Sequence, residues 1–116
     1  MMEFEIPDFF KTLEPSITVC DKNYILIYMN DKAVASYRDA GGKALLGQDI
    51  RICHRQASLD KMKAIMETGI PNAYTISKNG IRKLIYQAPW KNDDAIAGIV
   101  EFSIPIPDKM PHYVRS

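Results

Sequence analysis

The sequence of 116 residues lacks the features that mark several large classes of protein. Fifteen basic and fourteen acidic residues give a net charge of +1, which provides no one-sided basic field for a phosphate backbone, so we expect no nucleic-acid partner. No apolar run approaches the roughly 20 residues that cross a bilayer. The N-terminus opens with acidic MMEFEIPD rather than a basic signal-peptide start. We therefore expect a cytoplasmic protein without a membrane partner.

Cysteine is also scarce, since only Cys20 and Cys53 occur. In a cysteine-poor intracellular chain the thiols are usually reduced, so we expect no disulfide. No Pro/Gly/Ser tract or like-charge run indicates disorder, and 47% apolar with 25% charged residues is typical of a globular domain that folds alone. The length fits one hydrophobic core. We expect a single pocket beside it.

Apolar periodicity predicts two strands, then short helices, then three strands. The expected segments are a helix in PDFFKTLE (7–14), strands at 17–20 and 24–29, a helix in 31–40 capped by Asn30, a helix that follows a Ser58 cap and ends at Gly69, and strands at 72–78, 81–90 and 95–104. Asn79 and Gly80 between two β-rich segments indicate a tight hairpin. The predicted class is α+β, with a five-stranded antiparallel sheet and short helices packed on one face.

This order of elements resembles a PAS domain across about residues 9–106. The block GQDIRICHRQASLDKMKAIMETG, from Gly47 to Gly69, is similar to the G-x-x-x-x-x-C-H block of PAS domains that accompany hemerythrin-like domains in bacterial and archaeal proteins. The resemblance implies three parts: an N-terminal helix in 1–14, a PAS-like sensor domain in 15–107 and a C-terminal tail in 108–116. It implies a bacterial sensory, ligand-binding or protein-interaction module that takes part in signal transduction.

Two departures from PAS relatives limit what the resemblance implies. Light-sensing flavin PAS domains carry GxNCRFLQ, and aligning that motif with residues 47–54 places their reactive cysteine at Ile50, so we expect no covalent flavin adduct. Many PAS domains end in an Asp-Ile-Thr triplet, where this chain has Pro105, Ile106 and Pro107, and the prolines disfavour a helix leaving the sheet. Because only ten residues follow Ile106 in this sequence, we expect no kinase, cyclase or DNA-binding output. We expect its signal to pass through a homodimer or a partner signalling protein.

Cys53 and His54 are the only neighbouring thiol and imidazole in the sequence. Side chains of adjacent residues diverge, by about 100° on a helix and to opposite faces on a strand, so the two do not form a nucleophile–base pair. We therefore expect no enzyme and no catalytic residue, and the alternative is a small hydrolase or isomerase that uses this pair. A heme-based gas or redox sensor that uses His54 is a second alternative. No other metal site is expected, because zinc requires three or four convergent ligands.

A small hydrophobic pocket between the helices and the sheet is the predicted site. Its expected lining residues are Cys53, His54, Met62, Ile65, Met66, Tyr74, Ile76, Tyr86 and Trp90. Side chains alternate between the two faces of a strand, so we expect Tyr74 and Ile76 to share a face with Leu84, Tyr86, Ala88 and Trp90 of the next strand. On the last strand, the residues on this face are either Val100 and Phe102 or Ile99 and Glu101. Alternation alone does not decide between these two pairs, because it leaves the register open. Tyrosine and tryptophan suit a small amphipathic ligand. The alternative is that these aromatic residues fill the core or an interface.

The N-terminal segment carries more apolar surface than a short solvated helix needs, with Phe4, Phe9, Phe10 and Leu13. We expect it to pack on the sheet or against a second copy, and we expect a homodimer that also uses the outer face of the sheet.

Overall fold

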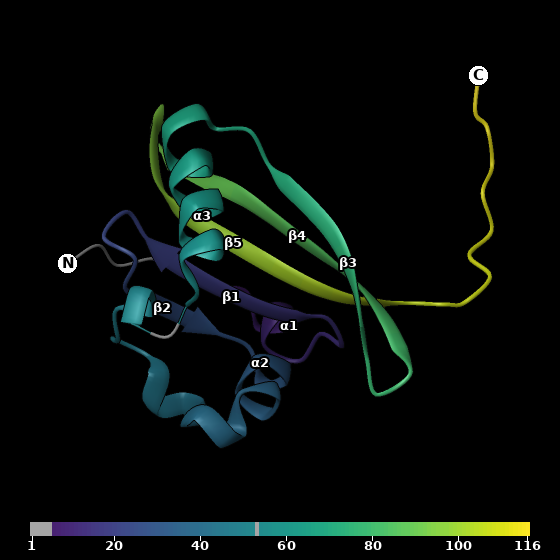
Figure 1. Cartoon of the computed structure of the whole chain (residues 1–116), viewed down its shortest axis with the longest axis horizontal. Coiled ribbons are helices and arrows are strands. Elements are labelled where there is room, and N and C mark those ends of the chain that lie inside the picture. The colour runs from purple at the N-terminus through teal and green to yellow at the C-terminus, as the bar shows by residue number, and fades with distance from the viewer. Residues whose placement is uncertain (1–5, 53) are drawn as a thin grey trace.

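The computed structural model describes residues 6–52 and 54–116 and is built around a five-stranded antiparallel sheet (Figure 1). The strands are β1 (Ser16–Asp21), β2 (Leu26–Met29), β3 (Asn72–Lys78), β4 (Ile81–Asn92) and β5 (Ala95–Ile106). Their order in the sheet is β2-β1-β5-β4-β3, so the first and last strands lie side by side at the centre. The predicted α+β class and sheet are confirmed.

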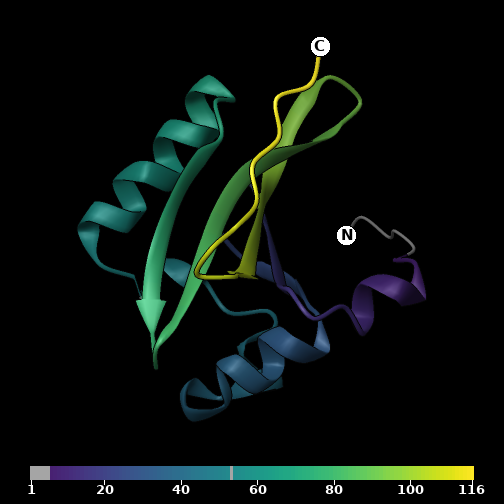
Figure 2. The same cartoon turned by 90° about the vertical axis from the view of Figure 1, so that its right-hand side faces the viewer.

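The helices are short, as expected. They are α1 (Asp8–Lys11), α2 (Asp31–Ser36), the 3-10 turns η1 (Arg38–Ala40), η2 (Gly42–Leu45) and η3 (Ile50–Ile52), and α3 (Gln56–Thr68). Figure 2 shows α3 on one side of the sheet and α1 on the other, with α2 and its neighbouring turns at the lower end of the molecule. The structure therefore separates the N-terminal helix from the helices that cover the sheet.

The bounds of two helices differ from the prediction. The helix α3 begins at Gln56 with Arg55 as its N-cap, because the Ser58 N–H already donates to the Arg55 carbonyl at 3.0 Å within the first turn. The predicted end is confirmed: Gly69 adopts a left-handed φ of 73°, and its N–H donates to the Ile65 carbonyl at 2.8 Å. The helix α1 covers only Asp8–Lys11 of the predicted 7–14.

The predicted β3–β4 hairpin is confirmed. Asn79 and Gly80 have φ values of 53° and 77°, the positive pair that a type I′ turn requires. Both β4 and β5 are longer than predicted, so the expected 91–94 loop shortens to a turn at Asp93 and Asp94, with Asp93 at a φ of 56°. The extra residue pairs lengthen the ladder between β4 and β5.

Asn30 joins three parts of the chain. Its side chain is completely buried, and its Oδ1 accepts from the Ile17 and Ala33 N–H groups at 3.0 Å each. Its Nδ2 donates to the Phe10 carbonyl at 3.2 Å and to the Pro15 carbonyl at 2.8 Å. The predicted cap of α2 is confirmed, and the same side chain also holds β1 and the end of α1 in place.

The core lies between α3 and the central strands. Cys20, Met62, Ile65 and Ile99 form one buried cluster, and a second one, of Leu26, Met29 and Ala33, joins α2 to β2. After β5, residues 107–116 carry no helix, as the prolines predict, and they run away from the sheet (Figure 1). Within the described residues, no helix is long and apolar enough to cross a membrane.

Candidate functional site

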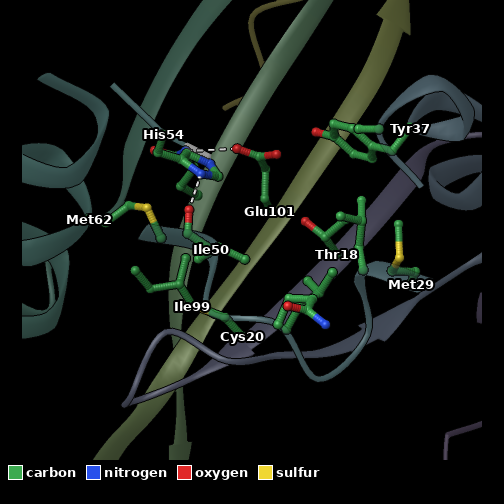
Figure 3. A pocket seen from close by; sticks show the side chains of 14 residues that line it. Thr18, Cys20, Met29, Tyr37, Ile50, His54, Met62, Ile99 and Glu101 are labelled. Atoms are coloured by element: carbon green, nitrogen blue, oxygen red, sulfur yellow. Dashed lines mark hydrogen bonds between the residues drawn. The ribbon is translucent and has the colours of Figure 1, made fainter. Parts of the chain in front are cut away.

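A cavity of about 320 Å³ lies between the sheet and the helical segments that cover it (Figure 3). The sheet contributes its floor from β1, β2, β4 and β5, while η1, η2, η3 and α3 contribute the roof. Its lining residues are Thr18, Cys20, Leu26, Met29, Tyr37, Ala40, Leu45, Gln48, Ile50, His54, Met62, Gln87, Ile99 and Glu101. Most of them are apolar, as in typical sites for small organic molecules.

A row of polar residues crosses the sheet beside this cavity. Thr18 pairs with Glu101, Glu101 with Gln87, and Gln87 with Asn72, so four strands contribute to one line. Directly paired residues on antiparallel strands point to the same face. Of the two alternatives left open for β5, the structure therefore selects Ile99 and Glu101 as the side that faces the cavity.

The same register corrects the expected grouping of β3 with β4. Tyr74 pairs with Ile85, and Tyr86 pairs with Ala73 and Phe102, so Tyr74 and Tyr86 point to opposite faces. The prediction that they share a face is wrong, because the two-residue turn at Asn79 and Gly80 pairs residues of opposite parity. Tyr86 lies on the outer face of the sheet, which is the face opposite the cavity.

Trp90 also occupies the outer side, opposite Gly98 on β5. Its indole Nε1 donates to the Cys20 carbonyl at 3.0 Å, reaching across β5 to β1. A Cβ on residue 98 would lie 2.5 Å from this nitrogen and would overlap the Cys20 carbonyl oxygen, so glycine is required. Trp90 therefore serves a structural contact in the sheet.

The remaining predicted pocket residues that the structure describes fall into three groups. His54 and Met62 line the cavity, while Ile65, only 2% exposed, and Met66 belong to the core beside it. Tyr74 and Ile76 lie on edge strand β3, exposed by 42% and 37%, outside the lining set. Cys53 lies outside the described residues.

Three polar residues of the cavity, Thr18, Gln87 and Glu101, lie on its sheet side, while Tyr37, Gln48 and His54 lie in the helical segments opposite. Figure 3 shows the Glu101 carboxylate facing His54, with the Tyr37 hydroxyl directed toward it from the opposite side. The Gln87 amide Nε2 donates to Glu101 Oε1 at 2.8 Å, and the Asn72 Nδ2 donates to Gln87 Oε1 at 3.0 Å. This chain of amides fixes the direction of the Gln87 side chain and holds the Glu101 carboxylate as an acceptor.

The His54 ring is fixed by a short contact with its own turn. Its Nδ1 lies 2.6 Å from the Ile50 carbonyl oxygen. A carbonyl oxygen only accepts, so Nδ1 carries the hydrogen, and in the neutral ring Nε2 is the acceptor. His54 thus adds a second acceptor to the lining of the cavity.

Burial and the negative charge of Glu101 raise the pKa values of two tyrosine hydroxyls. Burial, then Glu101 and Tyr74, raise the pKa of Tyr37 to about 12. Burial and Glu101 also raise the pKa of Tyr74. Both phenols therefore remain protonated at neutral pH, where they act as hydrogen-bond donors.

Cys20 is a buried thiol in the cavity wall. Burial is the main cause that raises the pKa of Cys20 from 9.0 to about 11. A neutral thiol is a poor nucleophile, because the thiolate is the reactive form. Cys20 therefore acts as an apolar wall residue at neutral pH.

We expect this buried thiol to make the fold sensitive to alkali. The folded pKa of Cys20 lies above the ordinary thiol value of 9.0, so its contribution to stability is intact below pH 9 and is lost as the pH rises toward 11. Urea titrations should show the free energy of unfolding falling by about 2–3 kcal/mol more in the native chain than in Cys20→Ala over this interval. Equal losses in the two proteins would contradict the assignment.

Arg51 is engaged away from the cavity. Its Nη2 lies 2.6 Å from Asp49 Oδ2, and its guanidinium lies 5.1 Å from the Tyr24 ring centroid. This ion pair lowers the pKa of Asp49. Among residues 6–52 and 54–116, no three His, Cys, Asp or Glu side chains come together as a metal site.

Several lining residues escaped the sequence prediction. Tyr37 lies between α2 and η1, and Leu45 lies in the 3-10 turn η2, where no apolar period marks them. Thr18 and Gln87 are polar residues within apolar strands. One signal was present in the sequence: the Asn-Gly turn fixes which β4 residues share a face with Tyr74, and this parity selects the side of β4 that carries Gln87.

Comparison with known proteins gives matches only at the level of structure. No family model matches the chain, and no curated protein sequence matches it. A C-terminal domain from Streptococcus mutans superposes with a TM-score of 0.67 at 20% identity, covering 84% of this chain and 79% of that one. The Aer2 receptor of Vibrio cholerae, described as a dual PAS-heme oxygen sensor, gives a TM-score of 0.63 at 15% identity, covering 80% and 95%.

A PAS domain from Colwellia psychrerythraea is similar over nearly its whole length. Its TM-score is 0.61 at 16% identity, with 88% of this chain and 94% of that chain covered. The sheet order, the long helix after the short turns and these superpositions agree. The chain has the PAS fold.

Proposed function

We propose that this chain is a non-enzymatic sensory module of PAS type whose cavity binds a small amphipathic molecule. The observation that carries the proposal is the cavity of about 320 Å³, with apolar walls and a few polar groups gathered around Glu101. Sites for small organic molecules have this composition and lie at roughly 300–1,000 Å³. The resemblance of the 47–69 block supports a place in the PAS subgroup that accompanies hemerythrin-like domains.

The chemistry of the described side chains supports binding rather than catalysis. The Cys20 thiol is neutral at neutral pH, with a pKa of about 11, and lacks the thiolate that nucleophilic attack requires. The His54 Nδ1 is held by the Ile50 carbonyl at 2.6 Å, without a carboxylate or nucleophile on that nitrogen. The geometry of a catalytic triad requires such partners.

We propose a small organic molecule rather than heme as the occupant of this cavity. The hydrogen bond from Nδ1 to Ile50 would suit a ligating His54, because metal-bound histidines usually donate their other N–H. The volume of about 320 Å³ lies at the lower end of the roughly 300–1,000 Å³ typical of small-molecule sites, and the Glu101 carboxylate lines the same cavity as the imidazole. We therefore propose an organic molecule of modest size as the occupant.

We also propose that the module signals through a second copy of the same chain. The outer face of the sheet carries Tyr86, exposed by 38%, and α1 carries Phe9, exposed by 63%. Both lie away from the helices that cover the cavity. Apolar surface of this kind favours association, and we propose a homodimer that uses α1 and the outer face.

The neutral fluorescent probe N-phenyl-1-naphthylamine should bind the native protein and gain fluorescence in the cavity. Leu45→Trp fills the cavity from η2 and should weaken binding by about tenfold or more, as expected from losing the burial of an aromatic ring. The matched control is Ala44→Trp, on the same turn but exposed and outside the lining set, which should bind like the native chain.

Equal binding by the native chain and Leu45→Trp would contradict the proposal. Native mass spectrometry of freshly purified protein provides an independent reading, since it detects a retained small molecule and a dimer in one spectrum. A Soret band in the same preparation would instead support the heme alternative.

A further inference from the structure

The electrostatic character of the cavity points to one class of ligand. Within the described set of lining residues, the Glu101 carboxylate is the one acidic group, and no lysine or arginine occurs. A half-buried carboxylate is stabilised by an opposite charge or by hydrogen-bond donors, and an approaching anion would be repelled. The cavity therefore has a negative end and apolar walls.

The protein holds this carboxylate in position from the sheet. Thr18 and Gln87 flank Glu101 on the two neighbouring strands, and the Gln87 amide is itself fixed by Asn72. Because the Gln87 side-chain oxygen already accepts from Asn72, the amide presents its nitrogen to Glu101 Oε1. One oxygen of the carboxylate thus accepts from the side chain of Gln87 on β4.

The surroundings of the carboxylate suit a protonated nitrogen. The His54 Nε2 is an acceptor in the neutral ring, because Nδ1 donates to Ile50. Figure 3 places the Tyr37 ring across the cavity from His54, on the other side of Glu101. Carboxylate and imidazole acceptors with a nearby aromatic ring are groups that stabilise an ammonium.

We propose that the occupant is a small organic amine, with its apolar body against Met29, Met62 and Ile99 and its protonated nitrogen on the Glu101 carboxylate. This inference rests on the proposed ligand-binding function and adds the chemical class of the ligand. The same arrangement disfavours carboxylates of equal size, which would place two anions at the polar end.

Three probes that share the same apolar phenylethyl group test the proposed ligand class: 2-phenylethylamine, 2-phenylethanol and 3-phenylpropionate. Their binding is followed through the methyl NMR signals of Met29 and Met62, which line the cavity. The amine should bind about tenfold or more tighter than the propionate, with the alcohol between them, in line with one charge-assisted hydrogen bond. Glu101→Gln should reduce this preference to about threefold or less.

The matched control is Glu67→Gln, which removes the same charge from the exposed side of α3 and should keep the native ranking. Equal affinities for the three probes, or an unchanged amine preference in Glu101→Gln, would overturn the ligand class while leaving ligand binding intact. If no probe moves the methionine signals, the proposed function itself fails. The ranking in the native protein needs no variant and decides the class even if Glu101→Gln does not fold.

Discussion

Replacing Gly98 by alanine is expected to destabilise the protein by at least about 3 kcal/mol, toward the upper end of single-site effects. The added methyl would overlap the Cys20 carbonyl oxygen, and it would lie 2.9 Å from the Asp21 Cα and 2.5 Å from the Trp90 Nε1. Two of these neighbours are backbone atoms of β1, so relief requires β1 and β5 to separate at their central ladder. Urea denaturation followed by circular dichroism measures the loss.

Two further variants separate steric overlap from other effects of losing a glycine. Gly80→Ala introduces strain at a φ of 77° but meets nothing within 4 Å, so it should cost only about 1–2 kcal/mol. Adding Trp90→Phe to Gly98→Ala removes the indole nitrogen but not the Cys20 carbonyl, and it should not restore stability. Similar losses in Gly98→Ala and Gly80→Ala would contradict the explanation.

Replacing Asn30 by alanine should reduce the free energy of unfolding by about 3–5 kcal/mol. The change removes a helix cap and leaves the buried Ile17 N–H without its acceptor, while the Phe10 and Pro15 carbonyls lose their donor. The measurement is again urea denaturation. Asn23→Ala, in the exposed β1–β2 turn, is the control and should change stability by less than about 0.5 kcal/mol.

Asn30→Asp provides a distinctive pH signature. The aspartate keeps an oxygen that can accept from the Ile17 and Ala33 N–H groups. It also places a carboxylate against the carbonyl oxygens of Phe10 and Pro15. Folding then raises the pKa of the new carboxyl, so the variant should be closest to native stability at low pH and should lose stability as the pH rises through that pKa. A loss that is independent of pH would contradict this account of Asn30.

Much of the fold could be predicted because its signals are local. The spacing of Met62, Ile65 and Met66 marked the buried side of α3, and Gly69 marked its end. The Asn79–Gly80 pair marked the β3–β4 hairpin. The sequence pattern predicts too late a start for α3, because Ser58 resembles a helix cap. In the structure Ser58 lies within the first turn of the helix.

The candidate site was harder to predict, because its geometry depends on pairing between distant strands. Glu101 faces the cavity through its register with Thr18 and Gln87, and alternation along β5 alone left two faces equivalent. The face of Tyr86 can be predicted from the sequence, since a two-residue turn fixes the parity of β3 against β4. Tyr37 was not predictable in this way, because its position follows from the irregular turns after α2.

The pairing of β1 with β5 constrains the order in which the molecule can be assembled. Ser16 lies opposite Ser103, so the centre of the sheet joins segments from the two ends of the chain. Contacts of such long sequence separation form late and slow folding, because the intervening chain must be ordered first. During synthesis the β1–β2 pair emerges with one edge unpaired until β5 is made. The floor of the cavity, which needs Cys20 and Thr18 from β1 and Ile99 and Glu101 from β5, is completed only at that last step.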